Sequence, residues 1–347
     1  MSDPMTDIDA LLLDTAERIF ADLATTETIN ACEQGRWPQA LWQALEDNGL
    51  TRALLPEDQK GSGLTLGQAA GVLRLAGYYA APVPLAESWL AGLALAAAGQ
   101  SVPAGALTVA TLALDGGNGD QLAAVPWGRR LPVVRLAAGH EDAAPRLQLI
   151  EDARLVREGA NIAGEPSDDL DLSGGRVTID VESPWTAEYW LAQAAVLRSM
   201  QMAGATRRCL DLACAYAAER KQFGRPLAKF QAIQQQLALL AGEAAAAETA
   251  AQAATATLAP ENGLLDAAVA KARAGLAVDG ATNIAHQVHG AMGFTYEHRL
   301  HHYTRRLWTW RDEFGDESYW NALIGRQALK AGGDGLWPLL TALGRSG

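Results

Sequence analysis

The spacing of apolar residues changes twice along this chain. From residue 1 to about residue 102, apolar positions recur three and four residues apart, which places them on one side of a helix. The spacing predicts amphipathic helices over residues 8–23, 38–48 and 86–98. We therefore expect an N-terminal helical domain over residues 1–102.

Between residues 103 and 182 the apolar runs become short, and each is bounded by residues that favour turns. Four runs read as strands, and three clusters rich in Gly, Asp and Pro separate them. The runs lie at residues 106–114, 130–137, 146–152 and 175–181, and the turn clusters at 116–120, 137–145 and 164–175. This pattern predicts a small, shortened middle β domain.

Helical spacing returns at residue 183. Ser183 is placed to cap a helix and Pro184 suits its first position, and an Ala-rich run continues to Lys221. Further helices are predicted over residues 226–258, 264–289, 297–313 and 316–330. Long helices joined by short loops favour a C-terminal four-helix-bundle domain over residues 183–347. The expected fold class is α+β, mostly α.

Charge and composition narrow the function classes. The chain has 28 Lys and Arg against 40 Asp and Glu, a net charge of -12, so it repels phosphate backbones and anionic lipids. We expect neither nucleic acid nor membrane as a partner, since no apolar run reaches membrane-spanning length. The acidic N-terminus does not resemble a signal peptide, and the three cysteines form no CxxC pair. We expect a cytoplasmic protein with reduced, buried cysteines.

Several kinds of binding site are excluded because the sequence lacks their motifs. No Gly-rich turn joins a strand to a helix, as nicotinamide binding requires, and no phosphate-binding loop is present. His298, His301 and His302 have a spacing that could present imidazoles to a metal ion on one helix. Because Arg305 and Arg306 follow and would repel a cation, we expect surface or interface histidines and no metal site.

Two segments of the predicted bundle carry chemical information. Residues 216–231 break a helix at a Gly beside Arg220 and other basic residues, which suits an anionic pyrophosphate. The alternative is an ordinary solvated turn with Phe223 and Phe230 in the core. Residues 287–294 end a long helix in a Gly-x-x-Gly turn, which suits either close approach of a ligand or a common helix C-cap.

Together, in this order and after a small β domain, the two segments resemble the acyl-CoA dehydrogenase family. The resemblance extends along the chain and is strongest over residues 190–326. It implies a helical, β and four-helix domain order, and an FAD cofactor. In the family, one subunit offers the first segment to the FAD that its neighbour holds.

The resemblance implies a role for each matching residue. Arg220 would pair with the FAD pyrophosphate, Gln222 and Phe223 would line the adenosine side, and Gln231 would hydrogen-bond the phosphates. The family's QxxGGxG segment is matched by Gln287, Gly290 and Gly293, with Ala291 replacing the second Gly of the pair.

The family's chemistry also demands a base. Desaturation of an acyl thioester requires a carboxylate that removes the α-proton while the β-hydrogen leaves as hydride to flavin. An ungapped count from Glu297 places the family's usual Glu at Phe314, which cannot accept a proton. The position used by a minority of the family falls at or near Ala194, so the resemblance implies no catalytic base here. Asp312, Glu313 and Asp316 are the neighbouring carboxylates, and Glu313 or Asp316 is the alternative base.

The middle domain departs from the family as well. It lacks the Thr-Glu-Pro-x-x-Gly-Ser-Asp loop and the Lys-x-Trp strand that hold the flavin ring. The chain thus resembles the short, flavin-poor subunit of heteromeric α2β2 acyl-CoA dehydrogenases of bacterial steroid side-chain degradation. This implies a larger acyl-CoA dehydrogenase subunit as partner, an acyl-CoA substrate such as a steroid side-chain thioester, and electron transfer flavoprotein as acceptor. The alternatives are a self-sufficient homomer that uses Glu313 or Asp316, and a flavin-free scaffold.

One polar pair interrupts the first bundle helix. Arg198 and Gln201 lie three residues apart in an otherwise apolar stretch. The pair either lines a remnant cavity or forms a hydrogen bond inside the bundle.

Overall fold

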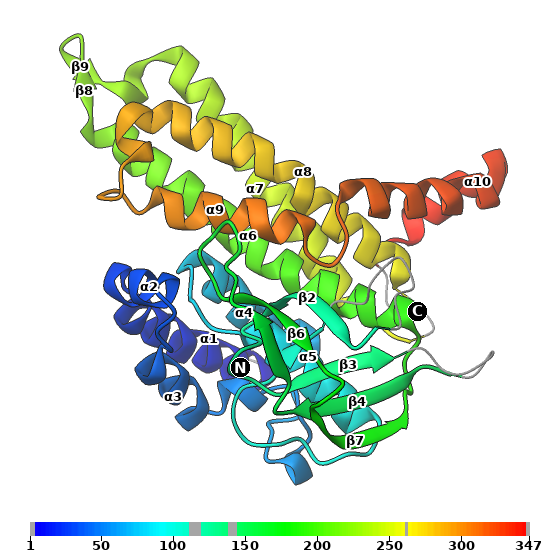
Figure 1. The fold of residues 1–347 in the computed structure, drawn as a ribbon. Coiled ribbons are helices and arrows are strands. Elements are labelled where there is room, and N and C mark those ends of the chain that lie inside the picture. The colour runs from blue at the N-terminus through cyan, green and yellow to red at the C-terminus, as the bar shows by residue number, and fades with distance from the viewer. Residues whose placement is uncertain (1–3, 111–118, 138–143, 261–262, 345–347) are drawn as a thin grey trace. The chain divides into compact units, whose positions relative to one another are not determined.

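The computed structural model describes residues 4–110, 119–137, 144–260 and 263–344 (Figure 1). The chain divides into two compact units. One comprises Met1–Val72 with Pro82–Ala194, and the other Leu73–Ala81 with Ala195–Gly347. The domain boundaries predicted at residues 102 and 182 both lie within the first unit and stay predictions.

Helices form the N-terminal part of the first unit. The helices predicted over 8–23, 38–48 and 86–98 are confirmed as α1, α3 and α5, whereas α2 and α4 were missed. Their bounds are α1 Pro4–Leu23, α2 Thr26–Glu33, α3 Gln39–Asp47, α4 Leu66–Tyr78 and α5 Leu85–Ala97. The helix α2 has only eight residues, and α4 contains three glycines, which lower helix propensity and weaken the sequence signal.

Seven strands are present in the described part of the β region. They are β1 Thr108–Val109, β2 Gln121–Pro126, β3 Val133–Ala137, β4 Arg146–Glu151, β5 Arg154–Arg157, β6 Ser167–Asp171 and β7 Arg176–Glu182. One sheet has the order β1-β3-β4-β7 and the other β2-β6-β5, and all pairs except β1 with β3 are antiparallel. Val125, Val133, Ile150 and Leu170 bring side chains from both sheets into one core.

The strand predictions were right for β3, β4 and β7 and wrong for residues 164–175, which contain the central strand β6. Much of the run predicted at 106–114 and of the clusters at 116–120 and 137–145 lies outside the described residues. The error at β6 has a physical cause, because its acidic residues are neutralised by arginines. Asp168, Asp169 and Asp171 pair with Arg129, Arg157 and Arg154.

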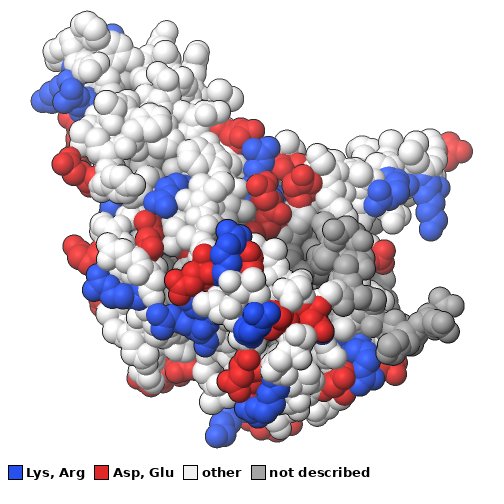
Figure 2. Space-filling view, viewed as in Figure 1, with Lys and Arg blue, Asp and Glu red and all other residues white. Residues whose placement is uncertain are grey.

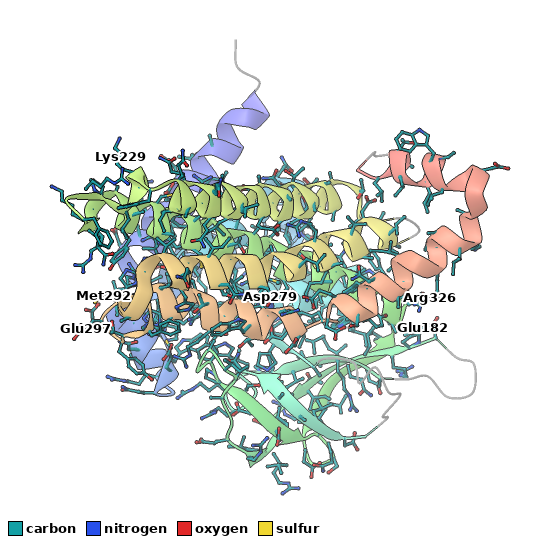
Figure 3. All side chains as sticks on the ribbon, turned by 90° about the horizontal axis from the view of Figure 1, so that it is seen from above. Glu182, Lys229, Asp279, Met292, Glu297 and Arg326 are labelled. Carbon is teal, nitrogen blue, oxygen red and sulfur yellow. The ribbon has the colours of Figure 1, made fainter. Side chains whose placement is uncertain are left out.

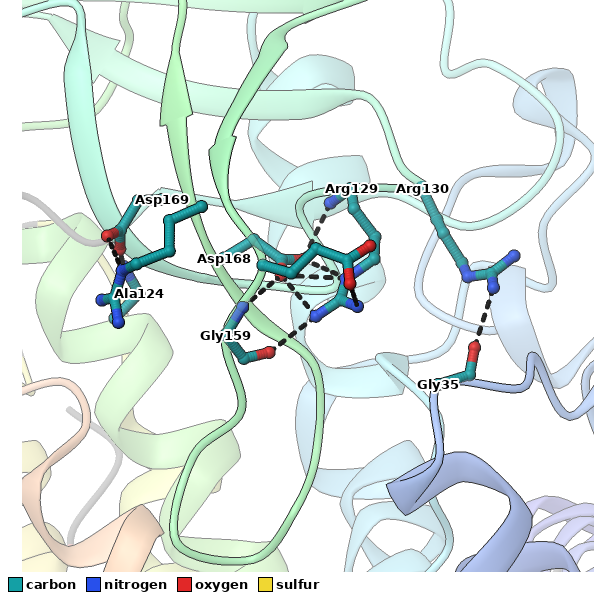
Figure 4. A network of polar contacts seen from close by, with 9 residues as sticks. Gly35, Ala124, Arg129, Arg130, Gly159, Asp168 and Asp169 are labelled. Carbon is teal, nitrogen blue, oxygen red and sulfur yellow. Dashed lines mark hydrogen bonds and ion pairs between the residues drawn. The ribbon is translucent and has the colours of Figure 1, made fainter.

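The most buried of these pairs fastens β6 to the loop after β2 (Figure 4). Asp168 is fully buried and accepts from Arg129 Nε at 2.9 Å, from the Arg129 backbone N–H at 2.9 Å and from the Gly159 N–H at 3.1 Å. Arg130 Nη2 donates to the Gly35 carbonyl at 2.8 Å, which ties this loop to the N-terminal helices of the same unit. Because the buried carboxylate of Asp168 is paired and hydrogen-bonded, an Asp-rich segment can form a strand inside the sheet.

The second unit is a bundle of long helices, as predicted. It comprises the end of α4 from Leu73 and the part of α6 Ala187–Glu219 that follows Ala194. The rest is β8 Lys221–Gln222, β9 Arg225–Pro226, α7 Gln231–Thr257, α8 Leu264–His289, α9 Leu300–Asp312 and α10 Glu317–Ala342. The predicted cap at Ser183 was wrong, because the Thr186 hydroxyl accepts from the Tyr189 N–H at 3.1 Å and α6 begins at Ala187. The helix predicted over residues 297–313 was also misplaced at its start, because α9 begins at Leu300.

A close helix crossing within the second unit holds the end of α4 against α6. A Cβ added at Gly77 would lie 1.9 Å from the Gln201 carbonyl oxygen, and one at Gly204 would lie 1.9 Å from the Arg74 carbonyl oxygen. The two backbones therefore touch, which only glycine permits. This contact sets the position of the α6 segment that carries Arg198.

Two further expectations are tested by the described residues. Cys32 and Cys209 are buried, but Cys214 is exposed, so the expectation was wrong there. Cys214 is exposed because Ala213 and Ala217 face the core, and the side chain of the next residue points about 100° away around the helix. None of the described helices has both the length and the apolar character of a membrane span.

Candidate functional site

The turn between α9 and α10 contains the position where the family's base is expected. Phe314 is buried and has a φ of 58°, in the left-handed region, and Gly315 follows with a φ of 89°. Trp320 Nε1 donates to the Phe314 carbonyl at 3.0 Å, and Lys271 Nζ donates to the Gly315 carbonyl at 2.8 Å. These bonds from α10 and α8 hold the Phe314 ring inside the protein.

A buried arginine lies against this ring. Arg198 on α6 is 3% exposed, and its guanidinium carbon lies 5.4 Å from the ring centres of both Trp310 and Phe314. Its Nη2 lies 2.8 Å from Glu313 Oε2, and its Nη1 donates to Gln201 Oε1. Of the two alternatives that the sequence left open, a remnant cavity or a hydrogen bond inside the bundle, the structure shows the hydrogen bond between Arg198 and Gln201. The guanidinium is thus held by a carboxylate, an amide and two aromatic faces.

Both alternative carboxylates have structural partners. The Glu313 carboxylate pairs with Arg198 at 2.8 Å, and Asp316 accepts the Tyr319 N–H at 2.8 Å as the N-cap of α10. At the minority position, Ala194 is buried and has no titratable group. A carboxylate paired with a guanidinium is a weak base, because the ionised form is favoured.

Lys271 was missed by the sequence reasoning. It is almost fully buried in α8, and its Nζ donates to the carbonyls of Arg311 at 2.7 Å and Gly315 at 2.8 Å. Burial lowers its pKa to about 8, against the opposing effect of the carboxylates of Glu313 and Glu317. The sequence did carry a signal for its burial, because Lys271 lies at the helical spacing of the buried residues of α8, which include Ala267, Ala268, Ala274 and Val278.

The Lys271 pKa predicts a pH-dependent stability. The folded state binds fewer protons than the unfolded state between pH 8 and 10.5, so the free energy of unfolding rises with pH across this window. The contribution is roughly 3 kcal/mol. Urea unfolding should show this rise in the wild type and lose it in Lys271→Met, whereas exposed Lys229→Met should keep it. Parallel pH profiles for the wild type and Lys271→Met would contradict the assignment.

The first of the two segments expected to contact FAD, residues 216–231, contains a hairpin after α6. Strands β8 and β9 pair across Phe223 and Gly224, whose φ values of 51° and 78° make a tight turn with both central residues left-handed. Phe223 is 91% exposed, so it is not a core residue, while the half-buried Phe230 ring lies 4.1 Å beneath the Arg225 guanidinium. Arg220, Gln222 and Gln231 are all exposed on this segment.

The second segment lies at the same end of the bundle (Figures 1 and 3). Helix α8 ends at His289, and Gly290 caps it with a φ of 59°. Nothing lies within 4 Å of a Cβ added at Gly290, whereas one at Gly293 would meet His289 Cβ at 3.0 Å. Gly290 thus leaves open space while Gly293 permits internal packing, and Gln287 is exposed. We call residues 220–231 and 287–296 the hairpin end.

Packed histidines support the hairpin end. His289 lies between Tyr216 and His298, with ring centres 4.6 and 4.5 Å away, and His286 stacks on Phe294 at 4.3 Å. Among the described residues, no group of three His, Cys, Asp or Glu is arranged to hold a metal ion. These rings therefore join the ends of α6 and α8 to the segment that follows η4 Gly290–Phe294.

The histidines predict loss of stability in acid. Burial lowers the pKa of His286 and His289, and burial with neighbouring histidines lowers that of His298 to about 4. The unfolded state therefore binds more protons below pH 6.5, and the free energy of unfolding falls from pH 6.5 toward pH 4. In thermal melts the decline should be smaller for His298→Gln than for the wild type. An unchanged decline would show that His298 does not titrate in this window.

The chain is similar in sequence to known acyl-CoA dehydrogenases. Residues 186–328 match the family model described as "Acyl-CoA dehydrogenase, C-terminal domain". The chain is similar to acyl-CoA dehydrogenase IpdE2 of Mycolicibacterium smegmatis, with 28% identity over 85% of this chain and 91% of that protein. It is also similar to IpdE2 of Mycobacterium tuberculosis, with 30% identity over 82% of this chain and 84% of that protein.

Solved structures show the same fold. A variant of the Tcur3481–Tcur3483 steroid ACAD superposes with a TM-score of 0.83 and 25% identity, over 94% of this chain and 99% of that chain. The ChsE4–ChsE5 complex from Mycobacterium tuberculosis gives a TM-score of 0.83 at 22% identity, over 95% and 98%, and bears on the fold alone. With the matched bundle and the relative of 30% identity, these similarities show that the chain belongs to the acyl-CoA dehydrogenase family.

Proposed function

We propose that this chain is the non-catalytic subunit of a heteromeric FAD-dependent acyl-CoA dehydrogenase. It would contribute contacts to the adenosine and pyrophosphate of an FAD whose flavin ring and catalytic Glu belong to a larger partner subunit. The observation that carries the proposal is Phe314, a buried aromatic ring at the position of the base, with Arg198 packed against it.

The two carboxylates that could replace the missing base are engaged in other contacts. Removal of the α-proton requires a carboxylate within hydrogen-bond reach of the acyl chain. Glu313 is bound to Arg198, and Asp316 caps α10. This pairing disfavours a self-sufficient homomer, in which one of these two carboxylates would have to be the base.

The hairpin end fits one part of FAD. Arg220 has an exposed guanidinium of the kind that pairs with phosphate, and Phe223 offers an exposed ring at the turn of the same hairpin. Gly290 leaves open space at the end of α8, so a ligand has access to the backbone. FAD supplies the hydride acceptor, and Arg220, Gln222, Phe223, Gln231, Gln287, Gly290 and Gly293 would hold its adenosine side. These residues favour flavin contact over a flavin-free scaffold.

The relatives support a substrate class and an assembly. The Tcur3481–Tcur3483 protein is described as a steroid ACAD, and its name joins two gene products. We propose an acyl-CoA substrate of the steroid side-chain type, an α2β2 assembly, and electron transfer flavoprotein as the acceptor. The proposed location is the cytoplasm.

Coexpression tests the proposal. The chain alone should purify colourless, and the chain with a larger acyl-CoA dehydrogenase subunit encoded beside it should purify as a yellow, active complex. Glu313→Gln and Asp316→Asn should leave the turnover of that complex within about twofold, since neither residue is the base. A yellow homomer that bleaches on addition of an acyl thioester, or loss of turnover in either variant, would refute the non-catalytic role.

A further inference from the structure

The tip of the β8–β9 hairpin carries a large aromatic residue where a small one is usual. Phe223 and Gly224 are the two central residues of the turn, and both have a left-handed backbone. Such a turn favours Asn, Asp or Gly, because a left-handed backbone crowds a larger side chain. Phe223 is 91% exposed, so burial of its ring does not offset the strain. Strain of this kind concentrates at functional sites, which indicates that the ring serves a contact outside the single chain.

A second ring supports Phe223 from within the chain. The ring centres of Phe223 and Phe230 are 6.2 Å apart with an angle of 71° between the ring planes, which is an edge-on aromatic pair. Phe230 directly precedes α7, and its carbonyl accepts the Gln234 N–H at 3.1 Å while its N–H donates to the Leu227 carbonyl at 3.0 Å. The first turn of a 27-residue helix thus fixes the Phe230 backbone. The ring pair connects the hairpin tip to this fixed point.

Arg225 covers the supporting ring. Its guanidinium carbon lies 4.1 Å from the centre of the Phe230 ring, within the range in which a cation is attracted to an aromatic face. Arg225 lies on β9 and pairs with Gln222 across the turn, so it belongs to the hairpin, whereas Phe230 belongs to the start of α7. The contact therefore fastens the hairpin to α7 through the same ring that Phe223 touches.

Basic side chains gather over this hairpin (Figure 2). The exposed cations of the segment are Arg220, Lys221, Arg225 and Lys229. The guanidinium of Arg225 is fixed by a ring of its own chain, so it is less available to a phosphate than an exposed guanidinium without such a contact. This arrangement favours a role for Arg225 in the shape of the hairpin.

We propose that Arg225 is a positioning residue for the FAD contact. Its guanidinium holds the Phe230 ring against the Phe223 ring, and in this way keeps Phe223 in place for the adenosine side of FAD. The inference rests on the proposed function, which assigns the adenosine contact to Phe223 and the pyrophosphate contact to Arg220. A ring that is fixed before binding loses less conformational freedom on binding, which favours affinity.

FAD titration of the coexpressed complex after dialysis measures the effect. Arg225→Met should raise the dissociation constant of FAD about three- to tenfold, because a cation over an exposed ring contributes modestly. Arg225→Lys keeps a cation and should stay within about twofold of the wild type. Lys229→Met is the matched control, since it removes another exposed cation of the same segment and should leave the dissociation constant unchanged.

A second background separates positioning from direct contact with phosphate. Phe223→Asn removes the ring and keeps the turn, because Asn-Gly is favoured at these two positions. In that background Arg225→Met should change the dissociation constant of FAD by less than about twofold, because no ring at the tip remains to be positioned. An effect of Arg225→Met that persists in full would overturn the inference, since Arg225 would then act directly on FAD or through Phe230 alone.

Fluorine NMR of the chain alone tests the stacked rings without FAD. The chain labelled with 4-fluorophenylalanine has five labelled positions, and Phe223→Asn and Phe230→Leu assign two of the resonances. Arg225→Met should shift the Phe223 and Phe230 resonances toward that of the free amino acid. The other three resonances should stay unchanged, which also shows that the variant is folded. An unchanged Phe223 resonance in Arg225→Met would contradict the positioning role.

Failure of this inference and failure of the proposed function give different results. A wild-type complex that binds no FAD, or one in which Arg220→Ala does not weaken FAD binding, would refute the flavin role together with the inference that rests on it. If Arg220→Ala weakens FAD binding and Arg225→Met does not, the flavin role stands and the positioning role of Arg225 is overturned.

Discussion

Gly204→Ala should destabilise the protein by at least about 3 kcal/mol, the largest stability change that we expect from a single methyl group. The new Cβ would lie 1.9 Å from the Arg74 carbonyl oxygen, far inside van der Waals contact, and the neighbour is backbone. The end of α4 and the middle of α6 would have to separate, and the contacts of Tyr78 with Asp211 and Arg208 would weaken as a result. Urea unfolding of the purified chain measures the change.

Gly242→Ala is the matched control on α7. Nothing lies within 4 Å of a Cβ added there, and the residue is exposed inside a helix. Alanine should therefore stabilise the helix by about 0.5–1 kcal/mol. If Gly242→Ala raises the free energy of unfolding and Gly204→Ala lowers it, the loss of stability at Gly204 is due to the helix crossing. A loss below 1 kcal/mol at Gly204 would show that the crossing relaxes easily.

Arg220→Ala should weaken FAD binding by the coexpressed complex on the order of 10- to 100-fold, since a hydrogen bond to a charged group contributes about 1.5–3 kcal/mol. Arg220 is exposed at the base of the hairpin, and its backbone is held by bonds from the Arg220 N–H to the Tyr216 carbonyl and from the Leu227 N–H to the Arg220 carbonyl. The substitution removes the guanidinium and leaves these bonds in place. Flavin absorbance after dialysis measures retention, and turnover should recover at high added FAD.

Lys229→Ala provides the comparison for this experiment. Lys229 is another exposed basic residue of the same segment, and no contact with FAD is proposed for it. Its loss should change flavin retention less than twofold, and Arg220→Lys should give an intermediate result because it keeps the charge without the planar fork. Equal flavin retention in Arg220→Ala and the wild type would exclude Arg220 from the pyrophosphate contact.

The hydrophobic pattern predicted most of the secondary structure in this chain. The apolar stripes of α1, α3 and α5 and the long bundle helices follow from it, because helix burial repeats every three to four residues. It failed at β6, where the acidic residues look like a turn until Arg129, Arg154 and Arg157 are placed beside them. It also misplaced the start of α6, since Ser183 and Thr186 are equally good caps in sequence.

The sequence by itself determined the family resemblance and the absence of a carboxylate at Phe314, because both depend on residue identity at fixed spacing. Only the tertiary structure decided what surrounds that residue. Arg198, Lys271 and Glu313 come from different elements, and distance along the chain carries no information on their contacts. The exposure of Phe223 and Trp337 was likewise decided by the fold, because an aromatic residue reads as core until its neighbours are known.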